Sequence, residues 1–430
     1  MTHFGIICPS AIGHLNPMCA LGAELQRRNH SVTIFGIADI ESKIENSGLN
    51  FWSIGEKDFP PGSLEQQYDE LGKMSKTKGL KFTIELILNE TKMLFNDLPQ
   101  AIKSAGVEAL IIDQVLRAGG TVADKLKLPH ITVCNALLIN QEAGVPPYFT
   151  HWGYNQAWWA QLRNRVGNLF LNRILLPIEQ EIQKQRQQWK LPLYHNREDA
   201  YSKLAQICQL PKEFDFPRKN LPNCFHYTGP LQNPSGIESV SFGDLSFPWE
   251  QLTDKPLIYA SLGTLQNKVP KIFQSIAEAV AELYAQLVIS LGNPRNQPEN
   301  YNLPDSVTVV SFAPHQKLID RSSVVITHAG MNTTLGALSS GVPIVAIPIT
   351  NEQPGIAARI ARTGAGEVVP LKKVSVERLY KATDRVLMGS SYKENAALLQ
   401  KSIKQAGGAS RAADIIEQVV TTGKPVLASC

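Results

Sequence analysis

Several features that mark particular classes of protein are missing from this sequence of 430 residues. Its longest apolar runs, such as residues 342–349, fall far short of the about 20 residues that a bilayer-spanning helix needs. It has no low-complexity tract and no internal repeat, which argues against a disordered, fibrous or solenoid chain. The first residues lack a charged segment followed by an apolar one, so we expect no signal peptide. These absences indicate a globular chain, and its length is sufficient for two hydrophobic cores.

Metal-binding and disulfide patterns are missing as well. The six cysteines form no Cys-x-x-Cys pair, which favours a reducing cytoplasm over a zinc site or a disulfide scaffold. The sequence has no Asp-x-Asp triplet that would hold a divalent ion on a diphosphate, and its histidines show no metal-ligand spacing. We therefore expect no essential metal and no cofactor. The net charge of +4 is small and dispersed, which argues against nucleic acid as a partner.

The first half of the sequence alternates between apolar runs and segments of helical periodicity. Strands are expected at residues 3–8, 31–35, 109–113 and 130–134, with helices at 17–28 and 120–127. Such alternation is typical of a doubly wound parallel sheet, which binds ligands at the carboxyl ends of its strands.

A second series of the same kind follows a stretch rich in Pro, Ser and Gly. Its strands are expected at residues 256–261, 285–290, 307–311, 324–327 and 342–347, with a helix at 272–283. The sequence therefore predicts an α/β fold of two Rossmann-like domains that face a cleft. We place them at residues 1–235 and 257–430, the second with a C-terminal tail, and the linker at 236–256.

Residues 152–190 carry Trp158, Trp159 and a run of Gln, Arg and Leu at helical spacing, with more basic than acidic residues. One interpretation is a solvated helical hairpin packed on the first domain. The other is an acceptor lid or a surface that meets membrane, because Trp and cationic side chains suit the headgroup region.

The densest group of polar and turn-forming residues is 327–334, which follows a strand and opens a helix. A helix N-terminus offers unpaired N–H groups and a positive dipole end to an anion, and Gly330 lets the backbone approach closely. His328 adds an N–H donor, while Asn332 and Thr333 add short polar side chains. This segment predicts a diphosphate site.

Two further turns belong to the same half. Ser261, Gly263 and Thr264 lie between a strand and a helix, where they could grip the same phosphates. Glu352 and Gln353 stand at the mouth of another strand and set a carboxylate beside an amide, a pair suited to adjacent sugar hydroxyls. Taken alone, such a pair would more often cap a helix.

The span from Phe312 to Gln353 resembles the nucleotide-sugar signature of UDP-dependent glycosyltransferases of the GT-B fold, family 1. Further segments look like zeaxanthin glucosyltransferases within that family: residues 214–226, 260–266, 352–360, 412–418 and 423–427. The likeness covers nearly the whole chain. It implies that the first domain binds the acceptor and the second binds a UDP-sugar.

The resemblance also implies roles for single residues. Phe312 would stack on the uracil ring. The diphosphate would be contacted by His328, Asn332, Thr333 and Thr264. The glucose hydroxyls would be contacted by Glu352 and Gln353.

Three positions depart from the family pattern. Phe312 stands where Trp is common, and His315 stands where Gln is usual. The carboxylate expected to bind the ribose hydroxyls falls at Gly336, which has no side chain. Ribose binding must then come from elsewhere or be weaker.

The catalytic base is expected in the first domain. His14 lies in the loop after the first strand, and an imidazole with a pKa near ~6.5 is suited to remove the proton of an alcohol. Asp113 ends the strand at 109–113 and should open on the same edge of the sheet. Its carboxylate would fix the tautomer of His14 and stabilise the imidazolium.

Together with the resemblance, these residues imply an inverting, metal-independent transfer of glucose from UDP-glucose to a lipophilic alcohol. The resemblance implies a carotenoid such as zeaxanthin as the acceptor. Tyr148, Phe149 and Trp152 are candidate walls for the acceptor, although they could equally belong to the core. We expect a cytoplasmic location, with peripheral contact to the membrane in which such an acceptor dissolves.

Other functions stay open. A promiscuous glycosyltransferase for flavonoids, sterols or other lipophilic alcohols is the alternative within enzymes, followed by a nucleotide-sugar epimerase. The departure at Gly336 allows a noncatalytic nucleotide-sugar-binding protein, against which His14 and Asp113 argue. An NAD-dependent oxidoreductase is disfavoured, because residues 5–14 do not read Gly-x-Gly-x-x-Gly.

Overall fold

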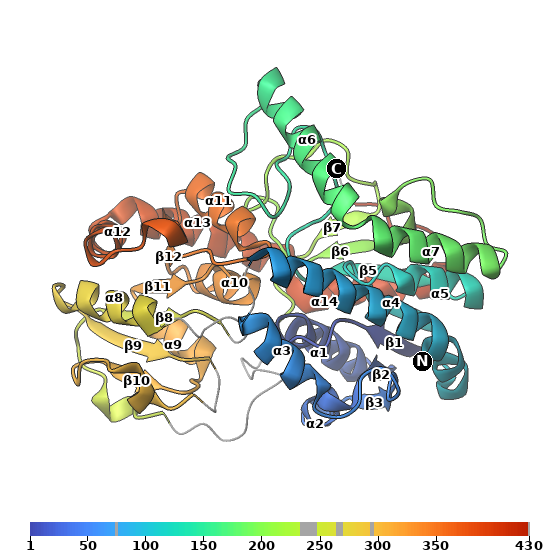
Figure 1. Ribbon diagram of the computed structural model, residues 1–430, viewed down its shortest axis with the longest axis horizontal. Coiled ribbons are helices and arrows are strands. Elements are labelled where there is room, and N and C mark those ends of the chain that lie inside the picture. The colour runs from blue at the N-terminus through green and yellow to red at the C-terminus, as the bar shows by residue number, and fades with distance from the viewer. Residues whose placement is uncertain (74–75, 233–246, 264–269, 293–295, 429–430) are drawn as a thin grey trace.

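The computed structural model describes residues 1–73, 76–232, 247–263, 270–292 and 296–428. These residues form two parallel β-sheets with helices on both faces of each (Figure 1). We call the part built on the first sheet the first lobe and the part built on the second sheet the second lobe. The predicted arrangement of two doubly wound α/β units is confirmed.

The first sheet has the strand order β3-β2-β1-β4-β5-β6-β7. Its strands are β1 (His3–Ile7), β2 (Ser31–Gly36), β3 (Asn50–Ser53), β4 (Ala109–Asp113), β5 (His130–Cys134), β6 (Gln206–Cys208) and β7 (Phe225–Tyr227). The second sheet has the order β10-β9-β8-β11-β12-β13. Its strands are β8 (Leu257–Ser261), β9 (Gln286–Ser290), β10 (Thr308–Val310), β11 (Val324–Thr327), β12 (Ile344–Ala346) and β13 (Gly366–Val368).

Helices cover both faces of each sheet. Those on the first sheet or beside it are α1 (Ile12–Arg27), α2 (Glu41–Glu45), α3 (Ser63–Lys73), α4 (Lys76–Ala105), α5 (Ala118–Leu126), α6 (Trp158–Ile174), α7 (Leu176–Gln188) and α14 (Gly408–Thr422). Those on the second sheet are α8 (Pro270–Ala281), α9 (His315–Arg321), α10 (Met331–Ser339), α11 (Gln353–Thr363), α12 (Val376–Met388) and α13 (Ser390–Ala406).

Alternation along the strands explains the two layers of helices. Successive side chains of a strand point to opposite faces of its sheet. In β1, Phe4 and Ile6 are fully buried in a core shared with α1, α2 and α14, whereas Ile7 belongs to the core under α4, α5 and α7. Strands buried on both faces carry near-continuous apolar residues, which is why the sequence shows them as apolar runs.

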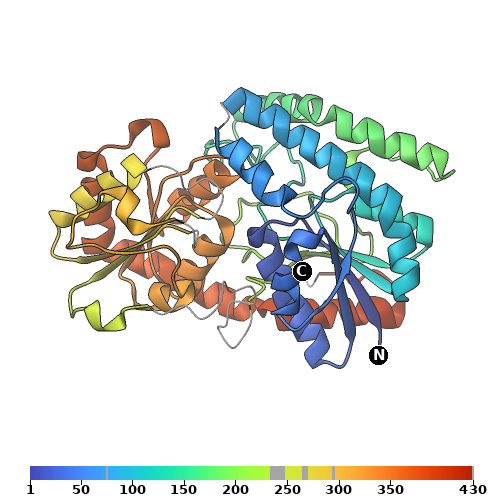
Figure 2. The ribbon, with the colours of Figure 1, turned by 60° about the horizontal axis from the view of Figure 1, so that its bottom comes forward.

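The last described helix crosses from one lobe to the other. After α13 the chain turns at Gly407 and Gly408, whose φ values of 91° and 57° favour glycine. α14 then packs on α1 in the first lobe, as Figure 2 shows in red. Arg28 binds Asp414 and Glu417 of α14 at 2.7 Å and 2.6 Å. Residues after 407, placed with the second domain from the sequence, thus complete the core of the first lobe. Of the linker expected at 236–256, residues 236–246 lie outside the described residues.

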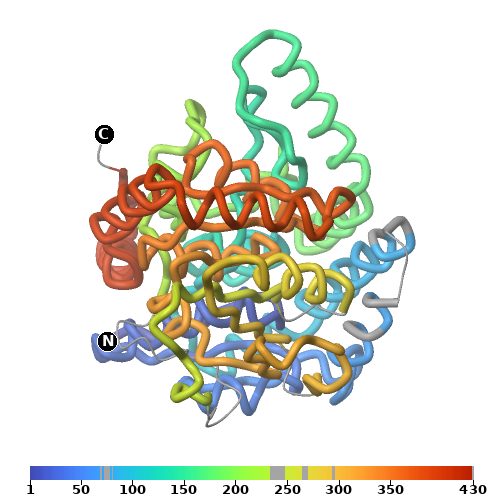
Figure 3. Tube along the Cα trace, turned by 90° about the vertical axis from the view of Figure 1, so that its left-hand side faces the viewer, coloured from blue at the N-terminus to red at the C-terminus, as the bar shows by residue number. Residues whose placement is uncertain are grey.

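Residues 152–190 form two helices joined almost directly. α7 packs on α4 and α5 of the first lobe, whereas α6 projects from it (Figures 1 and 3). Among the described helices, none has the length and apolar composition that crossing a bilayer requires.

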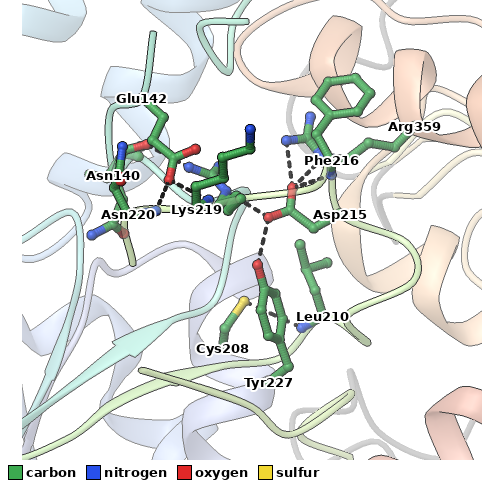
Figure 4. A network of polar contacts seen from close by, with 12 residues as sticks. Asn140, Glu142, Cys208, Leu210, Asp215, Phe216, Lys219, Asn220, Tyr227 and Arg359 are labelled. Atoms are coloured by element: carbon green, nitrogen blue, oxygen red, sulfur yellow. Dashed lines mark hydrogen bonds and ion pairs between the residues drawn. The ribbon is translucent and has the colours of Figure 1, made fainter. Parts of the chain in front are cut away.

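A buried ion network joins the lobes (Figure 4). Asp215, in a loop of the first lobe, accepts hydrogen bonds from Arg359 on α11 at 2.7 Å and 2.9 Å. Arg218 and the hydroxyl of Tyr227 donate to its other oxygen at 2.7 Å and 2.9 Å. Burial alone would raise the pKa of Asp215, but the two guanidinium groups hold that pKa well below its ordinary value. The network therefore fixes α11 against the first lobe.

Candidate active site

Each sheet has one point where the strand order reverses, and both points carry the candidate residues. In the first sheet the chain runs outward from β1 to β3 and returns to begin β4 beside β1. His14 follows β1 and Asp113 ends β4. Open α/β sheets bind ligands at the carboxyl ends of the strands at such a point. The second sheet reverses between β8 and β11, which lead to Ser261 and His328.

His14 lies in the first turn of α1, not in the predicted loop, because α1 begins at Ile12. Its Nδ1 atom lies 2.7 Å from Oδ2 of Asp113. The same carboxylate is buried and accepts hydrogen bonds from the Asn135 side chain at 2.8 Å and the Val115 backbone at 3.0 Å. These donors hold the carboxylate toward the ring, so in the neutral form of His14 the Nδ1 atom carries the proton and Nε2 keeps its lone pair.

The surroundings of His14 favour its protonated form. Burial lowers the pKa of His14, but the charge and hydrogen bond of Asp113, with smaller effects from Glu352 and Glu90, raise it above its ordinary value overall. Glu90, on α4, is itself perturbed: burial raises its pKa to about 7, with His14 opposing and Asp113 adding to that increase. No sequence pattern marks Glu90, which lies in a segment where no helix was expected. Asn135 directly follows β5. The reasoning that selected Asp113, a polar residue at the carboxyl end of a predicted strand, could have selected Asn135 as well.

In the second lobe, the His328 ring lies between two glycines. A Cβ atom at Gly263 or at Gly330 would lie 2.6 Å from ring atoms of His328, closer than real Cβ contacts. Gly263 also has φ of 82°, a left-handed conformation that favours glycine. Burial and the nearby His315 together lower the pKa of His328 to about 4, against a hydrogen bond with the Ser261 backbone that raises it, so the ring is neutral near pH 7. Both glycines are therefore needed to place this neutral ring.

The N-terminus of α10 is arranged as an anion site. Gly330 is its N-cap and supplies no side-chain hydrogen bond, so the first N–H groups of the helix are not capped. Ala329, just before it, has φ of 64°, and strained backbone of this kind clusters at functional sites. Thr333 is buried here in the first turn. Unpaired N–H groups and the helix dipole together favour a phosphate group at this position.

Asn332 reaches from α10 to the first lobe. Its side-chain amide donates a 3.1 Å hydrogen bond to the carbonyl of Gly13, the residue before His14. In an α-helix that carbonyl would accept from the residue four positions later, which is Pro17 and has no N–H group. Pro17 thus leaves the Gly13 carbonyl as an acceptor for Asn332. This hydrogen bond brings Asn332, which is predicted to bind the sugar donor, next to His14, the predicted base.

The two polar residues that follow β12, Glu352 and Gln353, have different surroundings. Oε1 of Gln353 accepts 2.9 Å hydrogen bonds from the backbone of Ile349 and Thr350, which leaves its amino group as a donor. Glu352 occupies the N-cap of α11 without making a side-chain capping bond. Its charge acts on both His14 and Tyr148. The capping interpretation therefore applies in part to Gln353, and Glu352 stays available to a ligand.

Three further positions belong to the predicted donor site: Thr264, Phe312 and Gly336. Thr264 lies outside the described residues. Phe312 is half-buried in the connection between β10 and α9. Gly336 is buried within α10, where a Cβ atom would lie 2.8 Å from Oε1 of Gln316. Gln316 thus occupies the space above Gly336, in which the resemblance would place a ribose-binding carboxylate.

The candidate acceptor residues lie on one segment between the lobes. The carbonyl of Tyr148 packs so closely on Gly355 of α11 that a Cβ there would lie 2.1 Å from it. Burial raises the pKa of Tyr148, against the charge of Arg197 and with that of Glu352. Tyr148 and Phe149 meet edge to face with ring centroids 5.7 Å apart. Trp152 lies farther along, under α6, with the Arg163 guanidinium 4.5 Å from its ring centroid.

This arrangement sets a histidine of the first lobe, suited to act as a general base, near a helix N-terminus of the second lobe, suited to bind an anion. A histidine with a free Nε2 faces, across the lobes, a helix N-terminus that can accept a diphosphate, and Glu352 lies within electrostatic reach of that histidine. Groups so placed can deprotonate one substrate while stabilising a phosphate leaving group on another. Within the described residues, no cluster of three His, Cys, Asp or Glu side chains could hold a metal ion.

Known proteins share both the sequence and the architecture. Residues 64–406 match the family model of UDP-glucoronosyl and UDP-glucosyl transferases. The chain is 33% identical to the zeaxanthin glucosyltransferase of Pantoea ananas over 99% of this chain and 98% of that relative. It is 31% identical to the zeaxanthin glucosyltransferase of Pseudescherichia vulneris, over 99% of this chain and 100% of that relative.

Solved structures match at lower identity. The calicheamicin glycosyltransferase CalG4 superposes with a TM-score of 0.74 at 18% identity, covering 99% of this chain and 100% of that chain. The glycosyltransferase VinC, solved in complex with DTDP, gives a TM-score of 0.69 at 17% identity, over 98% and 100% of the two chains. The GT-B fold expected from the sequence is confirmed.

Proposed function

The chain belongs to the UDP-glucoronosyl and UDP-glucosyl transferase family, and from this premise we propose that it transfers glucose from UDP-glucose to a hydroxyl of a lipophilic acceptor. The acceptor we propose is a carotenoid such as zeaxanthin, and the product a β-glucoside. The two relatives named as zeaxanthin glucosyltransferases support this acceptor class. We further propose a cytoplasmic enzyme that works peripherally at a membrane.

The hydrogen-bonded pair of His14 and Asp113 carries this proposal. As the acceptor oxygen attacks the anomeric carbon, Nε2 of His14 takes the hydroxyl proton, and Asp113 stabilises the imidazolium that forms. The bond from the anomeric carbon to the diphosphate oxygen breaks, and UDP leaves with the electron pair. Attack from the side opposite the leaving group inverts an α-linked sugar to a β-glucoside.

The second lobe would hold the donor. The N-terminus of α10 and the neutral His328 would bind the diphosphate and stabilise its charge as it leaves. Glu352 would accept hydrogen bonds from glucose hydroxyls, and the amino group of Gln353 would donate one. Phosphate stabilisation by a helix end requires no cation, so we propose that the reaction is metal-independent.

The test is an incubation with UDP-glucose and detergent-dispersed zeaxanthin, with and without EDTA, followed by mass spectrometry for mono- and diglucosides. We expect product in both samples, and a β anomer by NMR. His14→Ala should abolish transfer yet keep calorimetric UDP affinity within about twofold, since loss of a general base removes catalysis without removing the diphosphate site. The exposed His195 provides the matched control, and His195→Ala should keep full activity.

Other outcomes identify the alternatives. UDP-glucose binding without zeaxanthin products, but with products from flavonoids or sterols, would support the promiscuous glycosyltransferase. Donor binding without transfer to any lipophilic alcohol would support a noncatalytic nucleotide-sugar-binding protein. Equal activity of His14→Ala and the native chain would remove His14 from the mechanism.

A further inference from the structure

The outward face of α6 gathers many large apolar side chains that remain exposed in the described part of the chain. Its six members are 49–77% exposed: Trp158, Trp159, Leu162, Val166, Leu169 and Phe170. With 3.6 residues per turn, these positions fall within an arc of about 120° on the helix. Concentrated exposed apolar surface of this kind marks an interaction site rather than ordinary protein surface.

The opposite face of α6 fixes the helix in this orientation. Ala160, Asn164, Gly167 and Leu171 are buried against the first lobe. The Asn164 side chain donates a 3.0 Å hydrogen bond to the carbonyl of Ala143, and Gly167 lets Pro147 and Trp152 pack closely on the helix. The helix therefore cannot turn its apolar arc inward without breaking these contacts. Figure 3 shows that α6 stands away from the rest of the molecule.

The charges of α6 indicate what covers this face. The helix contains three arginines, Arg163, Arg165 and Arg173, and no acidic residue. None of the three takes part in an ion pair among the described residues. The guanidinium of Arg163 lies over the rings of Trp152 and Trp159 at 4.5 Å and 5.6 Å, between the apolar arc and the protein. Trp and Arg beside an exposed apolar arc match the composition of helices that lie in the interface of anionic bilayers.

We propose that the outward face of α6 docks on the surface of an anionic lipid bilayer; this inference rests on the proposed lipophilic acceptor. A second copy of the chain fits this face less well, because a twofold interface would bring together two helices that each carry three arginines and no acidic residue to pair with them. The bilayer instead offers phosphate groups to the arginines and hydrocarbon to the apolar arc. The helix lies on the membrane rather than crossing it.

The position of α6 links the membrane to the candidate active site. The short segment 147–152 packs on α6 through Pro147 and Trp152. At Tyr148 the same segment packs on Gly355 of α11, the helix that begins beside Glu352. A polyene that leaves the bilayer along this segment would reach the glucose-binding residues without entering bulk water.

Vesicle sedimentation of the full chain tests the proposal. The native chain should pellet with vesicles of phosphatidylglycerol and phosphatidylcholine, more weakly with phosphatidylcholine alone, and less as salt rises. The double variant Leu169→Gln/Phe170→Gln should lower the partition coefficient at least about tenfold, because two apolar side chains no longer enter the bilayer. Arg165→Gln/Arg173→Gln should lose binding to the anionic vesicles in particular.

Two controls keep the outcome interpretable. Met388 and Leu398 are comparably exposed apolar residues of the second lobe, and Met388→Gln/Leu398→Gln should bind vesicles as the native chain does. Native chain that fails to pellet, or unchanged partition of Leu169→Gln/Phe170→Gln, would overturn the proposal. So would a native dimer that this variant converts to a monomer in light scattering, since that result would assign the face to a second copy.

Activity measurements separate this inference from the proposed function. Leu169→Gln/Phe170→Gln should transfer glucose normally to detergent-dispersed acceptor and about tenfold more slowly to acceptor embedded in anionic vesicles. Vesicle binding by a native chain without transferase activity would contradict the proposed function and leave the docking surface in place. Transferase activity without vesicle binding would do the reverse.

Discussion

The protonation state of His14 depends on a small set of neighbouring carboxylates. Its pKa is raised above its ordinary value of about 6.5, whereas the proposed base must be neutral. We therefore expect kcat/KM to fall as the pH drops through a pKa above that value. Asp113→Asn should reduce kcat and move this acid limb to lower pH, because the charge that raises the pKa of His14 is gone.

Glu90→Gln is the matched variant for this measurement. It removes a carboxylate that acts on His14 through space and, unlike Asp113, makes no hydrogen bond to the ring. The acid limb should shift in the same direction by a smaller amount, with kcat little changed. A pH profile that is identical in the native chain and in Asp113→Asn would contradict the assignment of the limb to His14.

Gly263 offers a test of the second lobe at single-residue resolution. Gly263→Ala adds a Cβ to a left-handed residue, at a cost of about 1–2 kcal/mol, and presses it against the His328 ring. We expect calorimetric UDP affinity to fall roughly tenfold, as displacing one phosphate donor of about 1.4 kcal/mol would require. Gly62→Ala is the control: Gly62 also has positive φ, but nothing lies within 4 Å of its Cβ position. It should lose stability without losing UDP affinity.

How far the site could be predicted depends on where each residue stands relative to a strand end. The sequence reveals three site residues because each stands at or after the carboxyl end of an apolar strand: His14, Asp113 and His328. Glu90 lies within a helix, and no local pattern distinguishes it from a surface glutamate. The pairing of Asp215 with Arg359 joins positions 144 residues apart, which no spacing argument can reach.

At the scale of elements, α11 depends on the first lobe for its position. Asp215→Asn would leave Arg218 and Arg359 buried without their carboxylate, which typically costs about 3–5 kcal/mol. We expect a clear fall in Tm by calorimetry and a loss of kcat, because Glu352 and Gln353 begin this helix. Glu377→Gln breaks an exposed ion pair with Lys381 and should leave Tm unchanged. Equal Tm values for the two variants would contradict a stabilising role for the network.

The same network should make stability sensitive to acid. The pKa of Asp215 is lower in the folded chain than its ordinary value of about 3.9. Its contribution is therefore complete above pH ~4 and is lost as the pH falls toward the folded pKa. Unfolding midpoints measured between pH 5 and 2 should drop more steeply for the native chain than for Asp215→Asn.

The sequence revealed those strands that coincide with an apolar run. The strands expected at residues 3–8, 109–113 and 324–327 correspond to β1, β4 and β11. The missed strands β6, β7 and β13 have three residues each. The strands β10 and β12 are equally short, but they lie within the longer runs at residues 307–311 and 342–347, which is why they were expected. The helix expected at residues 17–28 is α1, which begins five residues earlier than the spacing of Leu and Ala predicts. Pro17 lies inside this helix, and the Gly13 carbonyl that it leaves without a backbone partner accepts a hydrogen bond from Asn332 of the other lobe.

At the scale of the whole molecule, α14 binds the two lobes into one folding unit. Its buried residues Ala412, Ile416 and Val419 belong to the core that also contains Phe4 and Ile6. A chain ending after Gly407 would expose this core, so we expect it to be insoluble. Ala412→Asp should destabilise the full chain strongly, because it buries an unpaired charge. Gln418→Ala, on the exposed side of α14, should not. A soluble 1–407 chain with a native Tm would contradict this.

The return of α14 also sets an order of events on the ribosome. The strands of the first sheet have all been translated by residue 227, yet the helix that covers one face of that sheet begins only at Gly408. At ~5–20 residues per second, the nascent first lobe waits roughly 10–40 s for it. During that interval an apolar surface is open to chaperones and to neighbouring nascent chains. Slow translation of the second half would therefore lower the yield of folded protein, even where the completed chain is fully stable.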